Sequence, residues 1–235
     1  MASVRDVVGG VLAKLKVHDV QVVAARELAP RFRLFELHSK SLRGAPWSPG
    51  DKLQLLLDAG ARTYTPFAFD AEHGTLSVLV FVHGDTPGSV WGRDAKPSDA
   101  LRVFGPRGSI PLASLDAPVI FFGDETSFGC ARALFDTHAN NSSFVFEVAE
   151  PDVAKRVLGE LGITGAQLVA RRADDGHLRE LERHLSDLAA RTPRASIVLT
   201  GRAPAIQQLR ASLKARSLST HKTKAYWAPG KRGLD

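Results

Sequence analysis

The second half of the chain alternates short apolar runs with segments of helical periodicity. Apolar runs cover 119–123, 144–147, 167–171 and 197–201, and helix-like segments at 128–137 and 152–161 follow the first two runs. Such alternation predicts a parallel sheet covered by helices, since parallel strands need long crossover connections. Two further stripes repeat at helical spacing and are expected to face the core: Leu178, Leu181, Leu185 and Leu188, and Ile206, Leu209 and Leu213.

The first half has a different pattern, with short strand-like runs separated by Pro and Gly. The runs cover 19–26, 32–38, 52–58, 61–69, 75–82 and 101–105, with a short helix expected at 89–95. Strands at this spacing predict an antiparallel barrel. We therefore expect a barrel domain at 17–113 and an α/β domain at 114–235. Apolar residues at helical spacing also predict a packing helix within 1–16, with a membrane-surface or partner-binding arm as the alternative.

Composition excludes several classes of protein. The apolar fraction of 44% is that of a globular protein, and no run is long and apolar enough for a transmembrane helix. The only cysteine, Cys130, excludes an internal disulfide and favours a cytoplasmic location. The eight histidines are scattered, so no protein-held metal is expected. The net charge of +6 accompanies no nucleic-acid-binding motif, and an anionic small ligand explains the local positive charge better.

Arg62-Thr63-Tyr64-Thr65 carries the clearest chemical signal. On one strand spanning 61–69, Arg62 and Tyr64 would share a face. The guanidinium can pair with a pyrophosphate, the phenol can lie against a flavin, and the Thr65 hydroxyl can hydrogen-bond the reactive ring nitrogen. The alternative interpretation is that these four residues belong to an ordinary half-exposed strand without a ligand.

The surrounding motifs occur in an order that resembles the siderophore-interacting protein family. They lie at 47–51, 62–65, 83–85, 87–91, 105–109 and 123–126, and end with Tyr226, Trp227 and Gly230. The resemblance implies the two-domain ferredoxin-reductase-like fold, an antiparallel β-barrel followed by an α/β domain with a parallel sheet. It also implies an FAD-dependent enzyme that reduces ferric siderophores with NADH or NADPH, or with reduced ferredoxin as an alternative donor.

The resemblance implies a set of site residues. Tyr64 and Thr65 are the expected catalytic residues, and Lys222 and Lys224 the expected siderophore-binding residues. The cofactor-binding residues are expected to be Arg62, Tyr64, Thr65, His83, Gly88, Ser89, Asp124, Thr126 and Gly201. Gly88 and Ser89 precede the short helix, whose free N–H groups would attract phosphate. Structural alternatives are a turn and helix cap for Gly88 and Ser89, a strand-end role for His83, and solvated charges for the two lysines.

The chain also departs from the family pattern. Phe67 stands where an Arg is expected, the 87–91 segment is shortened, and a later Gly-Glu pattern reads Gly201-Arg202. Asp124 and Glu125 would repel a pyrophosphate placed directly over them. Two other functions therefore stay open: an NAD(P)H-dependent flavin or electron-transfer reductase with another acceptor, and a siderophore- or flavin-binding protein without turnover.

Overall fold

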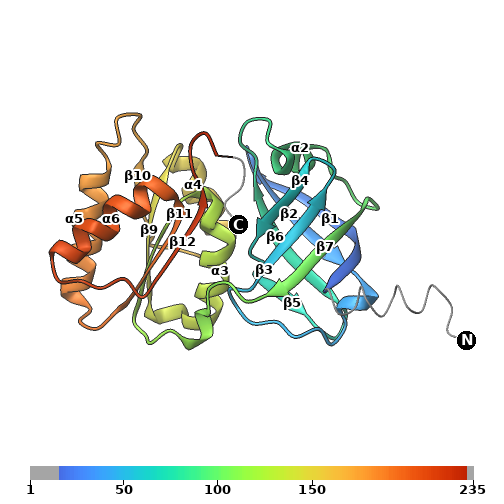
Figure 1. Ribbon diagram of the computed structural model, residues 1–235, viewed down its shortest axis with the longest axis horizontal. Coiled ribbons are helices and arrows are strands. Elements are labelled where there is room, and N and C mark those ends of the chain that lie inside the picture. The colour runs from blue at the N-terminus through green and yellow to red at the C-terminus, as the bar shows by residue number, and fades with distance from the viewer. Residues whose placement is uncertain (1–15, 232–235) are drawn as a thin grey trace, which may run out of the picture. The chain divides into compact units, whose positions relative to one another are not determined.

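A computed structural model describes residues 16–231, and the chain divides between Ser109 and Ile110 into two compact units (Figure 1). The expected boundary was at 113/114, four residues later. The helix expected within 1–16 lies, apart from Lys16, outside the described residues and stays a prediction. No helix of the described part of the chain has the length and hydropathy of a membrane span.

The first unit, the barrel unit, is a seven-stranded sheet in which every pair of neighbouring strands is antiparallel. The strand order is β4-β3-β7-β1-β2-β6-β5. Alternate residues point into one core, as the period of two requires. The strands are β1 (Val17–Ala29), β2 (Phe32–His38), β3 (Lys52–Leu57), β4 (Gly60–Tyr64), β5 (Ala68–Asp70), β6 (Thr75–Phe81) and β7 (Ala100–Arg107).

The strand expected at 61–69 is in fact two strands, and this part of the prediction was wrong. β4 ends at Tyr64 and β5 begins at Ala68, at opposite ends of the strand order. Pro66 lies between them and has no N–H for a sheet ladder, so the chain turns here. The Phe67 N–H then donates to the carbonyl of Ser77 on β6 at 3.2 Å.

The only α-helix of the barrel unit within the described residues, α2 (Pro87–Asp94), is held firmly against the sheet. The Arg33 guanidinium donates to the carbonyls of Gly92, Arg93 and Ala95 at 2.6, 2.7 and 2.9 Å, and so caps the C-terminal end. Gly92 allows close approach, because a Cβ there would lie 2.7 Å from a methyl group of Val80. These contacts hold the C-terminal half of α2 against the sheet.

The second unit, the α/β unit, has a five-stranded parallel sheet of order β10-β9-β8-β11-β12. Counted along the chain this order is 3-2-1-4-5, which matches five strands of the doubly wound 3-2-1-4-5-6 order. The strands are β8 (Val119–Gly123), β9 (Ser142–Val148), β10 (Gln167–Ala170), β11 (Ser196–Arg202) and β12 (Lys222–Trp227). The helices are α3 (Phe128–His138), α4 (Pro151–Glu160), α5 (Leu178–Arg191) and α6 (Ala203–Ala215).

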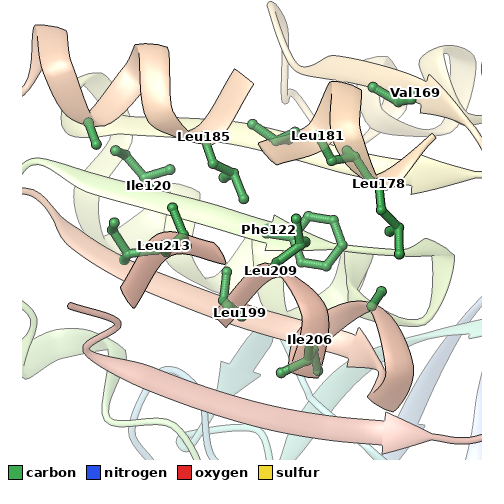
Figure 2. Packing of buried hydrophobic residues seen from close by; sticks show 14 residues of the cluster. Ile120, Phe122, Val169, Leu178, Leu181, Leu185, Leu199, Ile206, Leu209 and Leu213 are labelled. Atoms are coloured by element: carbon green, nitrogen blue, oxygen red, sulfur yellow. The ribbon is translucent and has the colours of Figure 1, made fainter. Parts of the chain in front are cut away.

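Helices cover both faces of this sheet, which explains why its central strand β8 is apolar throughout. Figure 2 shows Ile120 and Phe122 of β8 against the leucines of α5 and α6. On the opposite face Phe128 of α3 packs edge-on against Phe146, with ring centroids 4.9 Å apart. The prediction that the two leucine stripes are core packing is confirmed: all but the partly buried Leu188 are buried in this cluster.

Candidate functional site

In the barrel unit, Arg62 and Tyr64 of the expected flavin site pack directly on Gly88. A Cβ at Gly88 would lie 2.5 Å from the Tyr64 hydroxyl and 3.4 Å from Cγ of Arg62. Only glycine therefore allows β4 and the first turn of α2 to approach this closely. Burial raises the pKa of the Tyr64 phenol, while the Arg62 charge lowers it, so this group stays protonated at neutral pH.

The Arg62 side chain runs along β4 toward the β3–β4 turn. Its Nη1 donates to the carbonyl of Ala61 at 2.6 Å and lies 3.7 Å from the position of a Cβ on Gly60. No carboxylate pairs with Arg62 among the described residues. An anionic group can therefore take up its remaining donors.

Ser89 has a structural role in its present conformation. Its buried hydroxyl accepts from the His83 N–H and donates to the His83 carbonyl, both at 2.8 Å. Thr86 caps α2 by accepting from the Ser89 N–H at 3.4 Å. The His83 ring stacks on Phe81 with a centroid distance of 5.6 Å. The N–H of Gly88 remains the natural phosphate donor of this turn, because Pro87 has none and the Ser89 N–H is capped.

Thr65 follows β4 directly and is half-buried, ahead of Pro66. Its hydroxyl has no hydrogen-bond partner within residues 16–231. The group is therefore available to a ligand, and its expected contact with the flavin stays a prediction.

In the α/β unit, polar residues gather where the parallel strands end. Asp124 directly follows β8, and Gly201 is the last residue but one of β11. The strand order reverses between these two strands. Ligands of such sheets bind outside the carboxyl ends of the strands at this switch point. Gly201 has a φ of +99°, and a Cβ there would lie 2.7 Å from the Asp124 carboxyl. The two expected cofactor residues are thus brought together.

The Asp124 carboxylate is occupied by protein donors. Oδ1 accepts from the Thr126 N–H at 2.9 Å and from the Thr126 hydroxyl, and Oδ2 accepts from the Trp227 indole at 2.7 Å. Burial raises the pKa of Asp124 to about 6, with Glu125 and Glu147 adding to the rise, while the bonds from Thr126 and Trp227 oppose it. Asp124 and Thr126 therefore hold the edge of the sheet together, and their expected direct contact with the nucleotide stays a prediction.

Behind this edge lies a buried charged network that the sequence analysis missed. Glu147 of β9 is fully buried and accepts from Nε and Nη2 of Arg202 at 3.0 and 3.1 Å, and from Nε2 of His177 at 2.7 Å. The backbone N–H of Arg172 donates to Nδ1 of His177, so Nε2 carries the ring proton. Asp175 completes the network through a 2.6 Å bond from Arg202.

A second ion pair connects β10 with the same edge. Arg171 donates to Oε2 of Glu125 at 2.5 Å, and its guanidinium lies 5.9 Å from the centre of the Trp227 ring. Glu125 also accepts from the Ala149 N–H at 2.6 Å. The charge of Glu125 is thus neutralised locally, which removes much of the repulsion expected between this turn and an anionic ligand. The available signal was a charged residue inside or directly after each apolar run.

Lys222 and Lys224 lie on β12, the last strand of the sheet, opposite Val198 and Thr200 of β11. They share a face, because they are two residues apart on one strand. The register then shifts between Ala225 and Trp227, so that Tyr226 is the extra residue of a bulge and the row does not simply continue to it. Siderophore binding by these lysines stays a prediction. Within the described residues, no cluster of His, Cys, Asp and Glu could hold a metal ion.

Comparison with known protein families gives a match within the barrel unit. Residues 58–110 match the family model of the siderophore-interacting FAD-binding domain. This segment is therefore similar to the siderophore-interacting FAD-binding domain. The match contains β4, α2 and all of β7, and so includes Arg62, Tyr64 and Gly88. It confirms the resemblance seen in the order of the motifs.

Among characterised proteins, the chain is 32% identical over 77 residues to the NADPH-dependent ferric-chelate reductase of Escherichia coli (strain K12). The matched segment is 33% of this chain and 30% of that enzyme, so less than a third of the relative is covered.

Two solved structures extend the likeness of the FAD-binding domain to the whole fold. A siderophore utilization protein from T. fusca superposes with a TM-score of 0.71 at 24% identity, over 94% of this chain and 95% of that one. The siderophore-interacting protein SipS from Aeromonas hydrophila gives a TM-score of 0.74 at 20% identity, over 92% and 93% of the two chains. The expected ferredoxin-reductase-like fold, a barrel followed by an α/β domain, is confirmed.

Proposed function

We propose that the protein is an FAD-dependent oxidoreductase that reduces the iron of ferric siderophores, with NADH or NADPH as electron donor. The observation that carries this proposal is the packing of Arg62 and Tyr64 on Gly88 within the matched FAD-binding domain. One NAD(P)H would reduce two Fe(III) to Fe(II) and release NAD(P)⁺ and one proton. Oxygen-rich chelators hold Fe(II) less strongly than Fe(III), so reduction would favour release of the metal.

The residues of the barrel unit fit FAD. The Gly88 N–H and the Arg62 guanidinium offer donors to a pyrophosphate, and the protonated Tyr64 phenol offers a ring face and a donor. When bound, FAD supplies the step from two-electron to one-electron chemistry. The unpartnered Thr65 hydroxyl would hydrogen-bond near the reactive ring nitrogen and hold the ring in place.

The test of the proposal is reduction of the FAD-loaded protein by NADH or NADPH under anaerobic conditions, followed by reoxidation with ferric siderophores. A ferrous chelator that captures the product would show Fe(II) release. Reduction followed by reoxidation only with other acceptors would favour the flavin or electron-transfer reductase. Flavin binding without reduction by either nucleotide, or by reduced ferredoxin, would contradict an enzymatic role.

Replacing Arg62 by alanine should weaken FAD binding by about 1.5–3 kcal/mol, roughly 10-fold to 150-fold in the dissociation constant. The reason is loss of a charge-assisted contact to the pyrophosphate. Calorimetric titration of the apoprotein with FAD measures the effect. Arg62→Lys should lie between the two, because lysine keeps the charge but not the bidentate geometry.

Arg183→Ala is a suitable control, since Arg183 is exposed on α5 in the other unit. FAD affinity should be unchanged in this variant. Unchanged affinity in Arg62→Ala as well would reject the assignment of Arg62 while leaving the proposed function standing.

Lys222 and Lys224 are proposed to hold an anionic ferric siderophore. Changing both to glutamine should raise the apparent dissociation constant of a negatively charged ferric siderophore about threefold to tenfold at low salt, because two surface attractions are lost. A neutral ferric siderophore should be affected less, and the difference should shrink as salt is added. Acceptor titrations at several ionic strengths, at constant FAD occupancy, measure this.

The matched control is Lys155→Gln with Lys214→Gln, which removes the same charge from exposed positions on α4 and α6. If both double variants shift binding equally, the effect is one of net charge and the assignment of Lys222 and Lys224 is wrong.

A further inference from the structure

The net positive charge of the protein lies in one stretch of the chain, residues 203–231. The whole sequence has 31 Lys and Arg against 25 Asp and Glu, a formal net charge of +6. Residues 203–231 contain no Asp or Glu, and their six basic residues are Arg210, Lys214, Arg216, Lys222, Lys224 and Lys231. The rest of the chain therefore has 25 basic and 25 acidic residues and no formal net charge. A local excess of this kind attracts anions to one part of the α/β unit.

Most of these cations are not neutralised within the protein. Lys224 is half-buried, and the other five are exposed. Arg216 is paired with Glu182 of α5 at 2.8 Å. The remaining five have no carboxylate partner within residues 16–231. Their charge is therefore available to an external anion.

Arg210 and Lys214 lie on the outer flank of α6. The apolar stripe of α6 points into the core (Figure 2). Ser212 and Arg216 contact Glu182 of α5, so they mark the flank that faces α5. Arg210 and Lys214 lie about 120–160° around the helix from these two residues. Because α5 packs on β8, β9 and β10 while α6 packs on β11 and β12, this outer flank borders the β12 side of the sheet.

Lys222 and Lys224 border the same side from the other face of the sheet. Within the described residues β12 is an edge strand and pairs only with β11. Ala225 packs on the core cluster beneath α6, so Lys222 and Lys224 point to the opposite face. The two lysines are about 6.6 Å apart along the strand, and Arg210 and Lys214 about 6 Å apart along the helix. These four residues form two rows of similar spacing, which we call the basic edge.

We propose that the basic edge docks the protein on an anionic lipid bilayer. Each Lys or Arg close to such a surface strengthens binding roughly fivefold, and the contributions of neighbouring cations accumulate. The inference goes beyond the proposed function and does not depend on it, because no residue of the flavin site takes part.

The composition of the basic edge favours lipid over a protein partner. Specific protein interfaces have an apolar core with aromatic anchors, and lysine is depleted there. The large exposed hydrophobic side chains of the described residues, Val23 and Val90, both lie in the barrel unit. The basic edge therefore has charge without an apolar anchor. A bilayer surface needs only the summed charge, because its headgroups form a continuous sheet of anions.

Cosedimentation of the purified protein with lipid vesicles tests the proposal. The protein should bind vesicles of equal parts phosphatidylserine and phosphatidylcholine, and should not bind phosphatidylcholine alone. Binding should fall steeply with added salt, because the screening length shortens from about 10 Å at 0.1 M to about 3 Å at 1 M. Arg210→Gln with Lys214→Gln should lower the affinity for phosphatidylserine vesicles about 20-fold to 30-fold. Lys222 and Lys224 stay unchanged in this variant, since they are also proposed to bind the siderophore.

Arg179→Gln with Arg183→Gln is the matched control. It removes two cations, also four residues apart, from exposed positions on α5, within the part of the chain that has no net charge. Vesicle affinity should change less than about twofold, because these positions lie outside the basic edge. Circular dichroism checks that both double variants are folded.

Three results would overturn the proposal. Equal loss of affinity in the two double variants would make the effect one of net charge. Absence of binding to phosphatidylserine vesicles, or equal binding to both kinds of vesicle, would exclude docking on anionic lipid. Tighter binding to a DNA duplex than to the vesicles at the same salt, lost in Arg210→Gln with Lys214→Gln, would assign the basic edge to nucleic acid. Reduction of the flavin by NADH or NADPH is measured without vesicles, so each of these results leaves the proposed function standing.

Discussion

Glu147→Ala should lower the free energy of unfolding of the α/β unit by about 3–5 kcal/mol, because it removes one partner of a fully buried ion pair. Arg202 would lose two of its bonds, and His177 would lose the acceptor of its Nε2 proton. Burial lowers the pKa of Arg202, but the bonds that Arg202 donates to Glu147 and Asp175 outweigh burial and raise it. The guanidinium stays charged in the variant, because Asp175 still accepts from it and arginine is protonated at neutral pH. A buried cation would remain with Asp175 as its carboxylate partner.

Hydrogen exchange of peptides from β8, β9 and β11, read by mass spectrometry, measures this loss within the α/β unit. Glu147→Gln should lower the free energy of unfolding by less, since its amide oxygen still accepts a hydrogen bond. Exchange that is equally slow in Glu147→Ala and the parent protein would show that the network contributes little to stability.

Deprotonation of Asp124 should lower the free energy of unfolding of the α/β unit as the pH rises from about 4 to 7. Its pKa is raised from 3.8 to about 6 in the folded protein, so the folded state binds the proton more tightly than the unfolded state. The stabilisation is fully present below the unfolded pKa and is lost as the pH passes the folded pKa. The shift corresponds to about 3 kcal/mol.

Urea unfolding followed by the fluorescence of Trp227, with Trp47 and Trp91 replaced by phenylalanine, measures this at a series of pH values. The same series in Asp124→Asn should lack this contribution, and the difference between the two curves isolates it. Asp175 contributes in the opposite direction, because its bond from Arg202 lowers its pKa and is lost only at more acidic pH. Parallel curves for the two proteins between pH 4 and 7 would contradict the assignment.

The order of elements could be read from the sequence because each element carries a local signal. The run at 119–123 is apolar throughout, as a strand buried on both faces requires. The apolar residues of α5 and α6 repeat at helical spacing, as helices with one buried face require. The division of 61–69 into two strands was missed, although Pro66 gave the signal. Proline has no N–H to donate to a neighbouring strand, so a strand rarely continues through it. The order of the motifs also indicated the resemblance that the family model confirms over residues 58–110.

Tertiary structure alone decided which polar groups meet. Glu147 and His177 are 30 residues apart, and Asp124 and Trp227 are 103 apart, and no local period reports such pairs. Parallel strands bring their carboxyl ends to one edge whatever their separation in the chain, and burial there forces each charge to find a partner. Sequence by itself determined the order of strands and helices, apart from the division at Pro66, and the motif residues Arg62, Tyr64 and Gly88. Packing determined that Asp124 and Ser89 are bound to protein partners, while Arg62 and Thr65 remain open to a ligand.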